Sequence, residues 1–268
     1  MYASRTPRRS GGARSPKRAA LLLALLAVLG LSIPLNACDA GPVPAIQGEG
    51  DGARLAGTEG ADAMRGSAGT DRIEGLGGDD GLEGMSGRDT LYGGEGRDDI
   101  EGGSYADRAF GGPGIDQVVG DDGRDRLYGG EEPDALSGDE RDDRLYAGGG
   151  GGVANGGSGE DELTGGGGRD RLDGEADDDG VRGGPGDDRL EGGGGNDSLG
   201  GQDGDDSIFG EIGRDAMRGG DGNDFIDAID GFSDEEVDCG PGSADVAQVD
   251  AQDEATHCET LRAVEGRR

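Results

Sequence analysis

Apolar residues recur at one position in nine along most of this chain. From Gly57 to Asp227 a unit that reads G-G-x-G-x-D-x-U-x, where U is apolar, repeats nineteen times without insertion or deletion. A short x-U-x segment between glycine-rich stretches predicts a β-strand that turns a single side chain toward a core. Because one such strand cannot bury its own apolar residue, neighbouring units have to cover one another, and the pattern predicts a solenoid.

The polar positions of the unit are as regular as the apolar one. The sixth position is Asp in eighteen of the nineteen copies and fails only at Gly152. The first position is Gly in all copies but one, which has Ala147, and the fourth is Gly in fifteen. Glycine allows the positive-φ conformations and the close backbone approach that tight turns require. An aspartate fixed beside such turns at constant spacing predicts bound metal as well as a fold.

Composition and charge change the picture in one respect, the choice of partner. Hydrophobic residues make up 31% of the chain, glycine accounts for 63 of 268 residues, and the net charge is −34. Without the repeat, this composition is typical of a disordered acidic segment. Residues 1–37 contain six basic residues and no acidic one, so the remainder carries 59 acidic and 19 basic residues. This balance argues against nucleic acid as a partner and favours divalent cations.

The N-terminus has the layout of an export signal, which we place at residues 1–37. A basic stretch precedes an apolar run from Ala19 to Leu31, which is too short to indicate a membrane span. The segment that ends at Cys38 resembles the lipobox of bacterial lipoproteins and predicts a lipid on that cysteine; the alternative is an ordinary signal peptide cut nearby. We expect an exported protein, lipid-anchored at the cell surface or extracellular, with residues 38–56 as linker and N-terminal cap.

The other two cysteines predict a disulfide. If Cys38 carries lipid, Cys239 and Cys258 remain and oxidising surroundings favour their pairing, although a free dithiol is an alternative. Zinc is a poor fit because the single histidine, His257, has no further cysteines to join it. We expect residues 228–268 to form a C-terminal cap closed by this bond. Its segment after Cys239 resembles one more half-coil in which Ala244 replaces the Asp, so we expect no metal there.

The repeats resemble the RTX nonapeptide family, the haemolysin-type calcium-binding repeats, over 171 of 268 residues. The resemblance implies an all-β, right-handed parallel β-roll with two repeats in each coil. It also implies calcium ions between successive turns, held by turn carbonyls and by the aspartate at position six. The matching residues here are Asp62, Asp71, Asp80, Asp89, Asp98, Asp107, Asp116, Asp125, Asp134, Asp143, Asp161, Asp170, Asp179, Asp188, Asp197, Asp206, Asp215 and Asp224.

Elementary chemistry agrees with calcium. Two repeats in each coil would stack aspartates 18 residues apart in two ladders, with neighbouring strands about 4.8 Å apart. Stacked carboxylates repel each other, and an anionic cage of oxygens suits Ca²⁺ better than Mg²⁺ or zinc. Nineteen small apolar side chains are few to offset the backbone entropy of 171 residues. The sequence therefore predicts a chain that folds on binding calcium after export.

The repeat is weakest in residues 129–155. Glu132 and Arg141 replace the glycine at the fourth position, and one copy has Gly152 in place of Asp with Ala154 in its core position. The segment is either a hinge that divides two calcium-binding blocks or the result of sequence drift in a redundant array.

A second periodic feature lies outside the family pattern. Position nine is aromatic at four residues spaced by 18, and position seven is arginine at three residues beside them. An aromatic ladder next to an arginine ladder is a possible ligand face for sugar rings or an acidic polymer. The alternative is self-stacking that stabilises exposed strands. The residues are Tyr92, Phe110, Tyr128 and Tyr146 with Arg108, Arg126 and Arg144.

These features favour a structural or adhesive protein over an enzyme. A single histidine beside a cysteine makes no acid–base or nucleophilic constellation, and nothing outside the repeats is long enough for a catalytic domain. We expect calcium ions as the bound partner, with cell-surface polysaccharide or envelope components as further candidates. The alternative function is a carbohydrate-binding module that uses the aromatic ladder.

Overall fold

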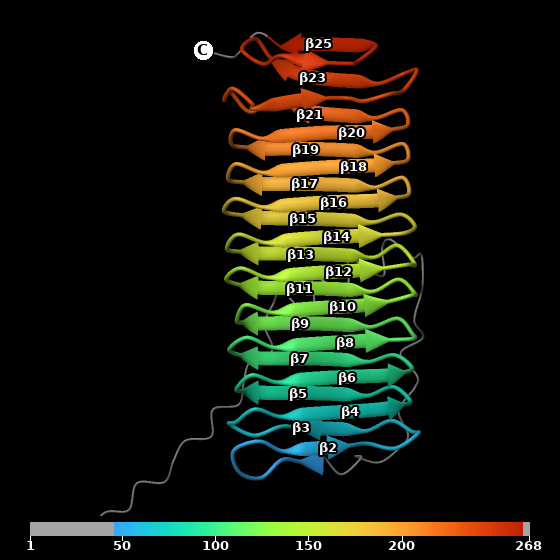
Figure 1. Cartoon of the computed structure of the whole chain (residues 1–268), viewed down its shortest axis with the longest axis vertical. Helices are drawn as coiled ribbons and strands as arrows, with labels where there is room; N and C mark the ends of the chain where they lie inside the picture. The colour runs from blue at the N-terminus through green and yellow to red at the C-terminus, as the bar shows by residue number, and fades with distance from the viewer. Residues whose placement is uncertain (1–45, 265–268) are drawn as a thin grey trace, which may run out of the picture.

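The computed structural model describes residues 46–264, in which all regular structure is β-strand. Twenty-five strands in this range form two parallel sheets that alternate along the chain (Figure 1). The odd-numbered sheet contains β1 (Ile46–Gln47), β3 (Ala63–Arg65), β5 (Gly81–Ser86), β7 (Asp99–Ser104), β9 (Gln117–Asp122), β11 (Ala135–Glu140), β13 (Val153–Ser158), β15 (Arg171–Ala176), β17 (Arg189–Gly194), β19 (Ser207–Ile212), β21 (Phe225–Ala228), β23 (Val246–Asp250) and β25 (Thr260–Val264). The even-numbered sheet contains β2 (Arg54–Ala56), β4 (Arg72–Gly77), β6 (Thr90–Glu95), β8 (Arg108–Gly112), β10 (Arg126–Gly130), β12 (Arg144–Gly148), β14 (Glu162–Gly166), β16 (Gly180–Pro185), β18 (Ser198–Asp203), β20 (Ala216–Asp221), β22 (Glu236–Asp238) and β24 (Ala255–Thr256).

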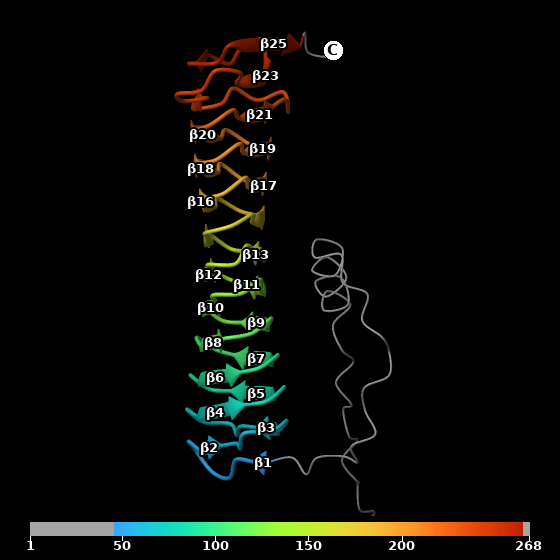
Figure 2. The same ribbon diagram turned by 90° about the vertical axis from the view of Figure 1, so that its right-hand side faces the viewer.

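Two nonapeptides make one coil, as predicted. Each strand pairs with the strand two elements further on, so that Met64 lies beside Leu82 and Leu82 beside Ile100, both 18 residues apart. Seen from its edge, the roll has the odd strands on one side and the even strands on the other (Figure 2). The chain is thus an all-β parallel solenoid. Within residues 46–264 no helix reaches the length and apolar character that crossing a membrane requires.

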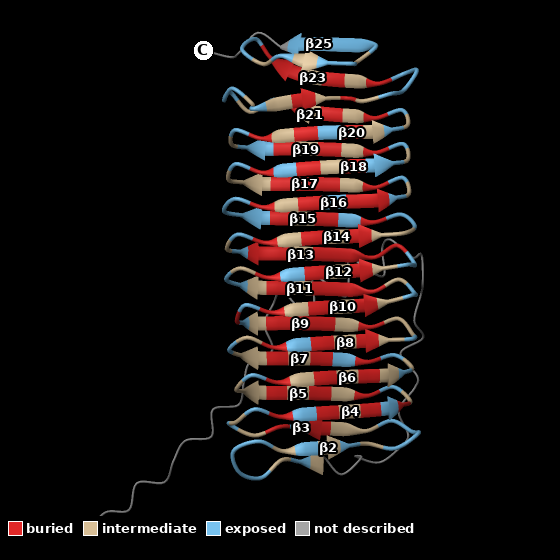
Figure 3. Ribbon diagram, viewed as in Figure 1, coloured by how far each residue is buried: buried red, intermediate tan, exposed pale blue. Residues whose placement is uncertain are grey.

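The core is a single file of side chains between the two sheets. All nineteen apolar residues at the eighth position, from Met64 to Ile226, are at most 3% exposed and belong to one cluster. Figure 3 shows this as a buried segment within most strands, flanked by more exposed residues. The predicted core is confirmed, and positions seven and nine of each unit point away from it, on the other face of the sheet.

Tight packing of successive turns explains the glycine pattern. Gly114, at the fourth position of its unit, has φ 139°, and a β-carbon there would overlap the carbonyl oxygen of Gly96 one coil earlier. In three of the four repeats that lack this glycine the backbone keeps the left-handed conformation: Tyr105 has φ 80°, Arg141 has φ 81° and Asp177 has φ 77°. The packing of successive coils therefore determines the conformation of the turn, and residues other than glycine adopt it under strain.

Both sheets continue without interruption through residues 129–155. Strand β11 pairs with β13, and β12 pairs with β14, in the same 18-residue register as elsewhere. Ala154 lies in the core at 0% exposure, and a second, smaller cluster joins Ala135 and Val153 with Ile115. No break of the strands marks the place where the sequence allowed a hinge.

Residues 228–264 add further coils, and here one prediction was wrong. Ile226 pairs with Ala247, 21 residues on, so Asp245 stands at the sixth position and not Ala244. The intervals between successive core residues widen from nine to eleven (Ile226 to Val237) and ten (Val237 to Ala247), because the turns between them are longer. The predicted signal at residues 1–37 and the lipid on Cys38 lie outside the described residues.

Candidate metal centre

The aspartates at the sixth position form two stacks on opposite edges of the roll. Those that precede odd-numbered strands we call the first ladder, and those that precede even-numbered strands the second ladder. The first ladder consists of Asp62, Asp80, Asp98, Asp116 and Asp134, then Gly152, then Asp170, Asp188, Asp206, Asp224 and Asp245. The second consists of Asp71, Asp89, Asp107, Asp125, Asp143, Asp161, Asp179, Asp197, Asp215, Asp234 and Asp253.

One hydrogen bond repeats along both ladders. The backbone N–H of an aspartate donates to Oδ1 of the aspartate one coil further on, at 2.9 Å from Asp80 to Asp98 and 2.7 Å from Asp125 to Asp143. Asp134 is an exception, because Gly152 follows it in the ladder. These bonds hold every carboxylate in one orientation, pointing back into its own turn. The sequence predicted which residues stack, and this bond fixes how they stack.

The second carboxylate oxygen is left without a partner. In seventeen described aspartates Oδ2 is buried and accepts no hydrogen bond; fifteen belong to the repeats and two are Asp234 and Asp245. Burial of an unpaired charged oxygen is costly, and such atoms are rare in folded proteins. A whole row of such buried oxygens therefore predicts a bound cation.

Backbone carbonyls converge on the same place. A β-carbon built on Gly165 would lie 2.5 Å from Asp170 Oδ2 and 2.5 Å from the carbonyl oxygen of Gly183 in the next coil. For Gly192 the corresponding distances to Asp197 Oδ2 and the Gly210 carbonyl are 2.5 and 2.8 Å. The turn thus gathers a carboxylate and a carbonyl around a point where only glycine leaves room.

Burial shifts the acidity of these carboxyl groups. Desolvation, aided by neighbouring carboxylates, raises the pKa of Asp107 and Asp179 to about 8 and that of Asp143 to about 9, although the backbone N–H bonds oppose it. Asp170, which follows Gly152, has its pKa raised only to about 6, by burial alone. Without a cation, Asp107, Asp143 and Asp179 therefore resist ionisation at neutral pH.

The donor set fits calcium. Every donor in the turns is an oxygen, which suits a hard cation and gives zinc none of its preferred nitrogen or sulfur ligands. In residues 46–264 no group of three or more His, Cys, Asp or Glu side chains is arranged to hold a metal. This agrees with a site in which backbone carbonyls supply most ligands and each turn contributes one carboxylate.

A family comparison agrees with this geometry. The family model described as RTX calcium-binding nonapeptide repeat matches residues 48–82, 82–104, 101–136, 128–151, 146–181, 155–190, 182–217 and 191–226. The chain belongs to this family. RTX repeats bind Ca²⁺, and proteins that carry them are typically exported. A search of curated proteins finds no match to the chain.

The gap in the first ladder of this RTX roll has a steric counterpart. In eighteen repeats, the β-carbon position of the first-position glycine lies within 2.9 Å of Oδ2 of the aspartate five residues on. In the remaining repeat the first position is Ala147, 3% exposed, and the aspartate is replaced by Gly152. The methyl group of Ala147 thus takes the place of the carboxylate. The glycine lost at Ala147 and the aspartate lost at Gly152 therefore compensate each other sterically, which their positions in the sequence do not reveal.

Sequence reasoning missed the last steps of both ladders. Asp234, Asp245 and Asp253 accept the same backbone hydrogen bond as the repeat aspartates, and Glu259 Oε2 accepts the one from Asp245 at 3.0 Å. The signal was present in Asp245-Val246-Ala247, which keeps the spacing of the D-x-U triplet. It was obscured because the glycines before it are out of register.

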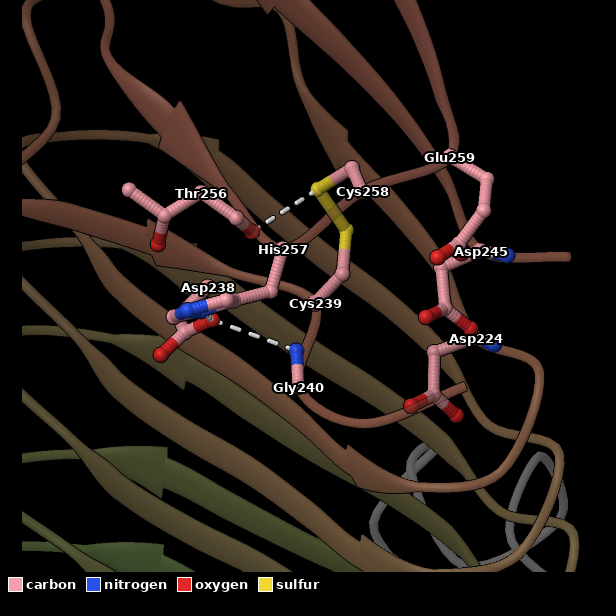
Figure 4. The surroundings of a disulfide bond; sticks show 9 residues. All are labelled: Asp224, Asp238, Cys239, Gly240, Asp245, Thr256, His257, Cys258 and Glu259. Carbon is pink, nitrogen blue, oxygen red and sulfur yellow. Dashed lines mark hydrogen bonds and ion pairs between the residues drawn. A yellow bond between two sulfur atoms is a disulfide. The ribbon is translucent and has the colours of Figure 1, made fainter. Parts of the chain in front are cut away.

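The predicted disulfide between Cys239 and Cys258 is present, with Cα atoms 5.2 Å apart. Cys239 directly follows β22, and Cys258 lies between β24 and β25, so the bond joins the last two coils. Figure 4 shows it beside Asp224, Asp245 and Glu259, the final steps of the first ladder.

The aromatic residues form the predicted ladder. Rings of Tyr92, Phe110, Tyr128 and Tyr146 stack with centroids 4.8–4.9 Å apart and interplanar angles of 4–7°. The guanidinium of Arg72 covers the outer face of Tyr92 at 4.4 Å. Arg108, Arg126 and Arg144 stand side by side on the same strands. The ring faces therefore meet each other, and mainly ring edges remain for solvent.

Proposed function

We propose that this chain is an exported RTX protein whose β-roll folds around calcium outside the cell and then serves as a structural or adhesive element. The eighteen repeat aspartates are the calcium ligands in this proposal, and Asp234, Asp245 and Asp253 extend the two rows. A lipid on Cys38 would tether the roll to a membrane surface, and free secretion is the alternative.

One observation carries the proposal: the row of buried Oδ2 atoms that accept no hydrogen bond. Each of the fifteen repeat oxygens in this row faces a turn carbonyl from the next coil, so a cation between coils would neutralise two stacked carboxylates and bridge them. The unfolded chain has no such preformed cage. The binding energy of the metal therefore becomes folding energy.

A calcium-dependent fold suits a protein that has to cross a membrane first. Where calcium is scarce, repulsion along the ladders keeps the chain from compacting. Extracellular calcium is near 1 mM, the range in which weak extracellular modules bind, and it would then close the roll. The role we assign is non-catalytic; the one histidine, His257, bonds to Asp238 at 2.7 Å on the surface of the last coils.

The alternative function, a carbohydrate-binding module, needs a different location from the one that the sequence suggested. Sugar rings bind aromatic side chains through open ring faces. In the stack from Tyr92 to Tyr146 the inner faces are occupied by neighbouring rings. The stack supports self-stabilisation of the even-numbered sheet, and any saccharide contact there would be limited to ring edges and hydroxyl groups.

The number of bound calcium ions tests the ligand assignment. We would replace Asp107, Asp125, Asp143 and Asp161 by Asn and titrate calcium into the variant and the parent protein by calorimetry. The matched control replaces four exposed acids of the same region, Asp99, Asp122, Glu131 and Glu140, by their amides, which changes the charge equally without touching a ladder. The proposal predicts several fewer ions for the ladder variant and an unchanged number for the control. Equal numbers in all three proteins would remove the aspartates as ligands.

A further inference from the structure

A hollow of about 520 Å³ opens on the second-ladder edge of the roll, beside the turns that precede β6, β8 and β10. Its lining includes Ser86, Arg88, Ser104, Tyr105, Ala106, Asp122, Gly123, Arg124 and Arg141. A second hollow of about 240 Å³ adjoins it, shares Arg88, Ala106 and Arg124, and adds Arg108 and Arg126. The two together form one depression that leads from the turns toward the aromatic ladder.

A size difference at the fifth position of the repeat creates the depression. Arg88 and Arg124 occupy this position in the coils on either side, and Ala106 occupies it between them. A short side chain between two long ones leaves a gap one coil wide. Five arginines line the depression beside three aspartates, Asp89, Asp107 and Asp122, and such an excess of guanidinium groups is unusual on a chain with a net charge of −34.

The arginines around the depression are only partly paired. Arg124 meets Asp142 and Arg141 meets Asp122, each at 2.8 Å and each pair largely exposed. Among residues 46–264, by contrast, no carboxylate forms an ion pair with Arg88, Arg108 or Arg126. Acids greatly outnumber bases in this protein, so three guanidinium groups around one hollow that pair with no described carboxylate form an anion-attracting patch.

Tyr105 supplies the apolar wall. It is 63% exposed and, unlike the rings of the aromatic ladder, stacks on no other ring of the described residues. It stands at the fourth position, where fifteen repeats have glycine, and holds φ at 80°. A bulky residue kept in this conformation is strained, and such strain tends to accompany ligand contacts.

We propose that this depression binds an acidic sugar, a hexose unit that carries a carboxylate or a sulfate group. The open face of Tyr105 would stack on the sugar ring, and the guanidinium groups of Arg88, Arg108 and Arg126 would hold its anionic group through paired N–H donors. Ser86 and Ser104 offer hydroxyl groups to the ring hydroxyls. A long polyanion such as nucleic acid is disfavoured, because the surface beyond these few coils is acidic.

The inference rests on the proposed function, since the turns have to be folded for the hollow to exist. It is tested by calorimetry on the calcium-saturated protein with three probes: a galacturonic acid tetramer, a sulfated heparin-type tetrasaccharide and a neutral glucose tetramer. We expect one or both acidic probes to bind and the neutral one to bind at least tenfold more weakly. The stronger acidic probe identifies the anionic group. Equal binding of all three, or of none, would overturn the proposal.

Two variants locate the site. Tyr105→Gly restores the common residue of the repeat, so it should fold as well as the parent and yet weaken binding at least fivefold. Arg88→Gln should weaken it similarly. The matched controls are Tyr92→Ala in the aromatic ladder and Arg65→Gln at an ion-paired site, with less than twofold change expected. Unchanged affinity in both test variants would contradict this location. Circular dichroism in calcium shows separately whether the roll itself has formed.

Discussion

The two aspartate ladders run along opposite edges of one roll, yet only the second is continuous. It passes from Asp71 to Asp253 with a carboxylate in every coil, whereas the first lacks one at Gly152. The strands beside the gap keep their register: Val153 pairs with both Ala135 and Arg171. Strand pairing and the apolar core therefore determine the geometry of the coil, with or without a ladder carboxylate. The ladder carboxylates are not needed for this geometry; they add negative charge that a bound cation would neutralise.

A change of pH should have the largest effect on the stability of the metal-free roll, because it acts on ladder aspartates in many coils at once. Burial raises the pKa of Asp107 and Asp179 to about 8, above the ordinary aspartate value near 4. The folded metal-free roll then holds protons that the unfolded chain releases. Its stability is greatest below about pH 4 and falls as the pH rises toward 8. Metal-free protein should therefore contain more β-structure at pH 5 than at pH 8 by far-UV circular dichroism.

Light scattering at both pH values serves as the control for aggregation near the isoelectric point of about 4.1. Less β-structure at pH 5 than at pH 8 in monomeric, metal-free protein would show that the buried carboxyl groups are not the source of the instability.

Removing one ladder carboxylate should cost more inside a continuous row than beside the gap. Asp143 has ladder neighbours Asp125 and Asp161 on either side, whereas Asp170 has Gly152 on one side. At calcium concentrations about 100 times the dissociation constant, each lost site removes about 2.7 kcal/mol of stability. Asp143→Asn removes a carboxylate between two ladder neighbours and should lower the free energy of unfolding by about 5 kcal/mol. Asp170→Asn has one such neighbour and should lower it by about half as much.

Urea unfolding in calcium measures the difference between these two variants, and Asp99→Asn, an exposed acid, is the control. Equal losses in the two ladder variants would mean that each aspartate serves its own site without bridging its neighbours.

The disulfide joins the last two coils of the roll. It lies beside Asp245 and Glu259, the last bonded pair of the first ladder. Replacing Cys239 and Cys258 by Ser should lower the free energy of unfolding by about 3 kcal/mol, because the bond closes a loop of 19 residues' separation. Hydrogen exchange should rise in β22–β25 and remain unchanged in β4–β20. Faster exchange throughout the roll would contradict this local role.

The smallest expected effect comes from restoring an aspartate at Gly152, the gap in the first ladder. Gly152→Asp alone should cost about 1–3 kcal/mol, because the methyl group of Ala147 occupies the space of the carboxylate. The double variant Ala147→Gly with Gly152→Asp should recover that loss and bind one or two more calcium ions by calorimetry. A double variant no more stable than Gly152→Asp alone would show that the substitutions at positions 147 and 152 do not compensate each other.

The sequence predicted the coil well because one spacing determines it. Asp and the apolar position recur together, so the two sheets, the core from Met64 to Ile226 and both stacks of aspartates follow from the period. The orientation of the carboxylates could not be read in this way, since it depends on hydrogen bonds between residues 18 apart. Asp234 and Asp245 were missed because turns of unequal length break the spacing. The exposed ring of Tyr105 appeared in the sequence only as a lapse from glycine.

The most direct test of the central claim is far-UV circular dichroism of the exported part, residues 38–268, during calcium titration at neutral pH. We expect a largely unstructured chain in chelator and a cooperative gain of β-structure as calcium rises through about 0.1–1 mM, with no such transition in magnesium. A complete β-signal in chelator at pH 7.5, unchanged by calcium, would contradict it, because the buried carboxylates would then tolerate each other without a metal.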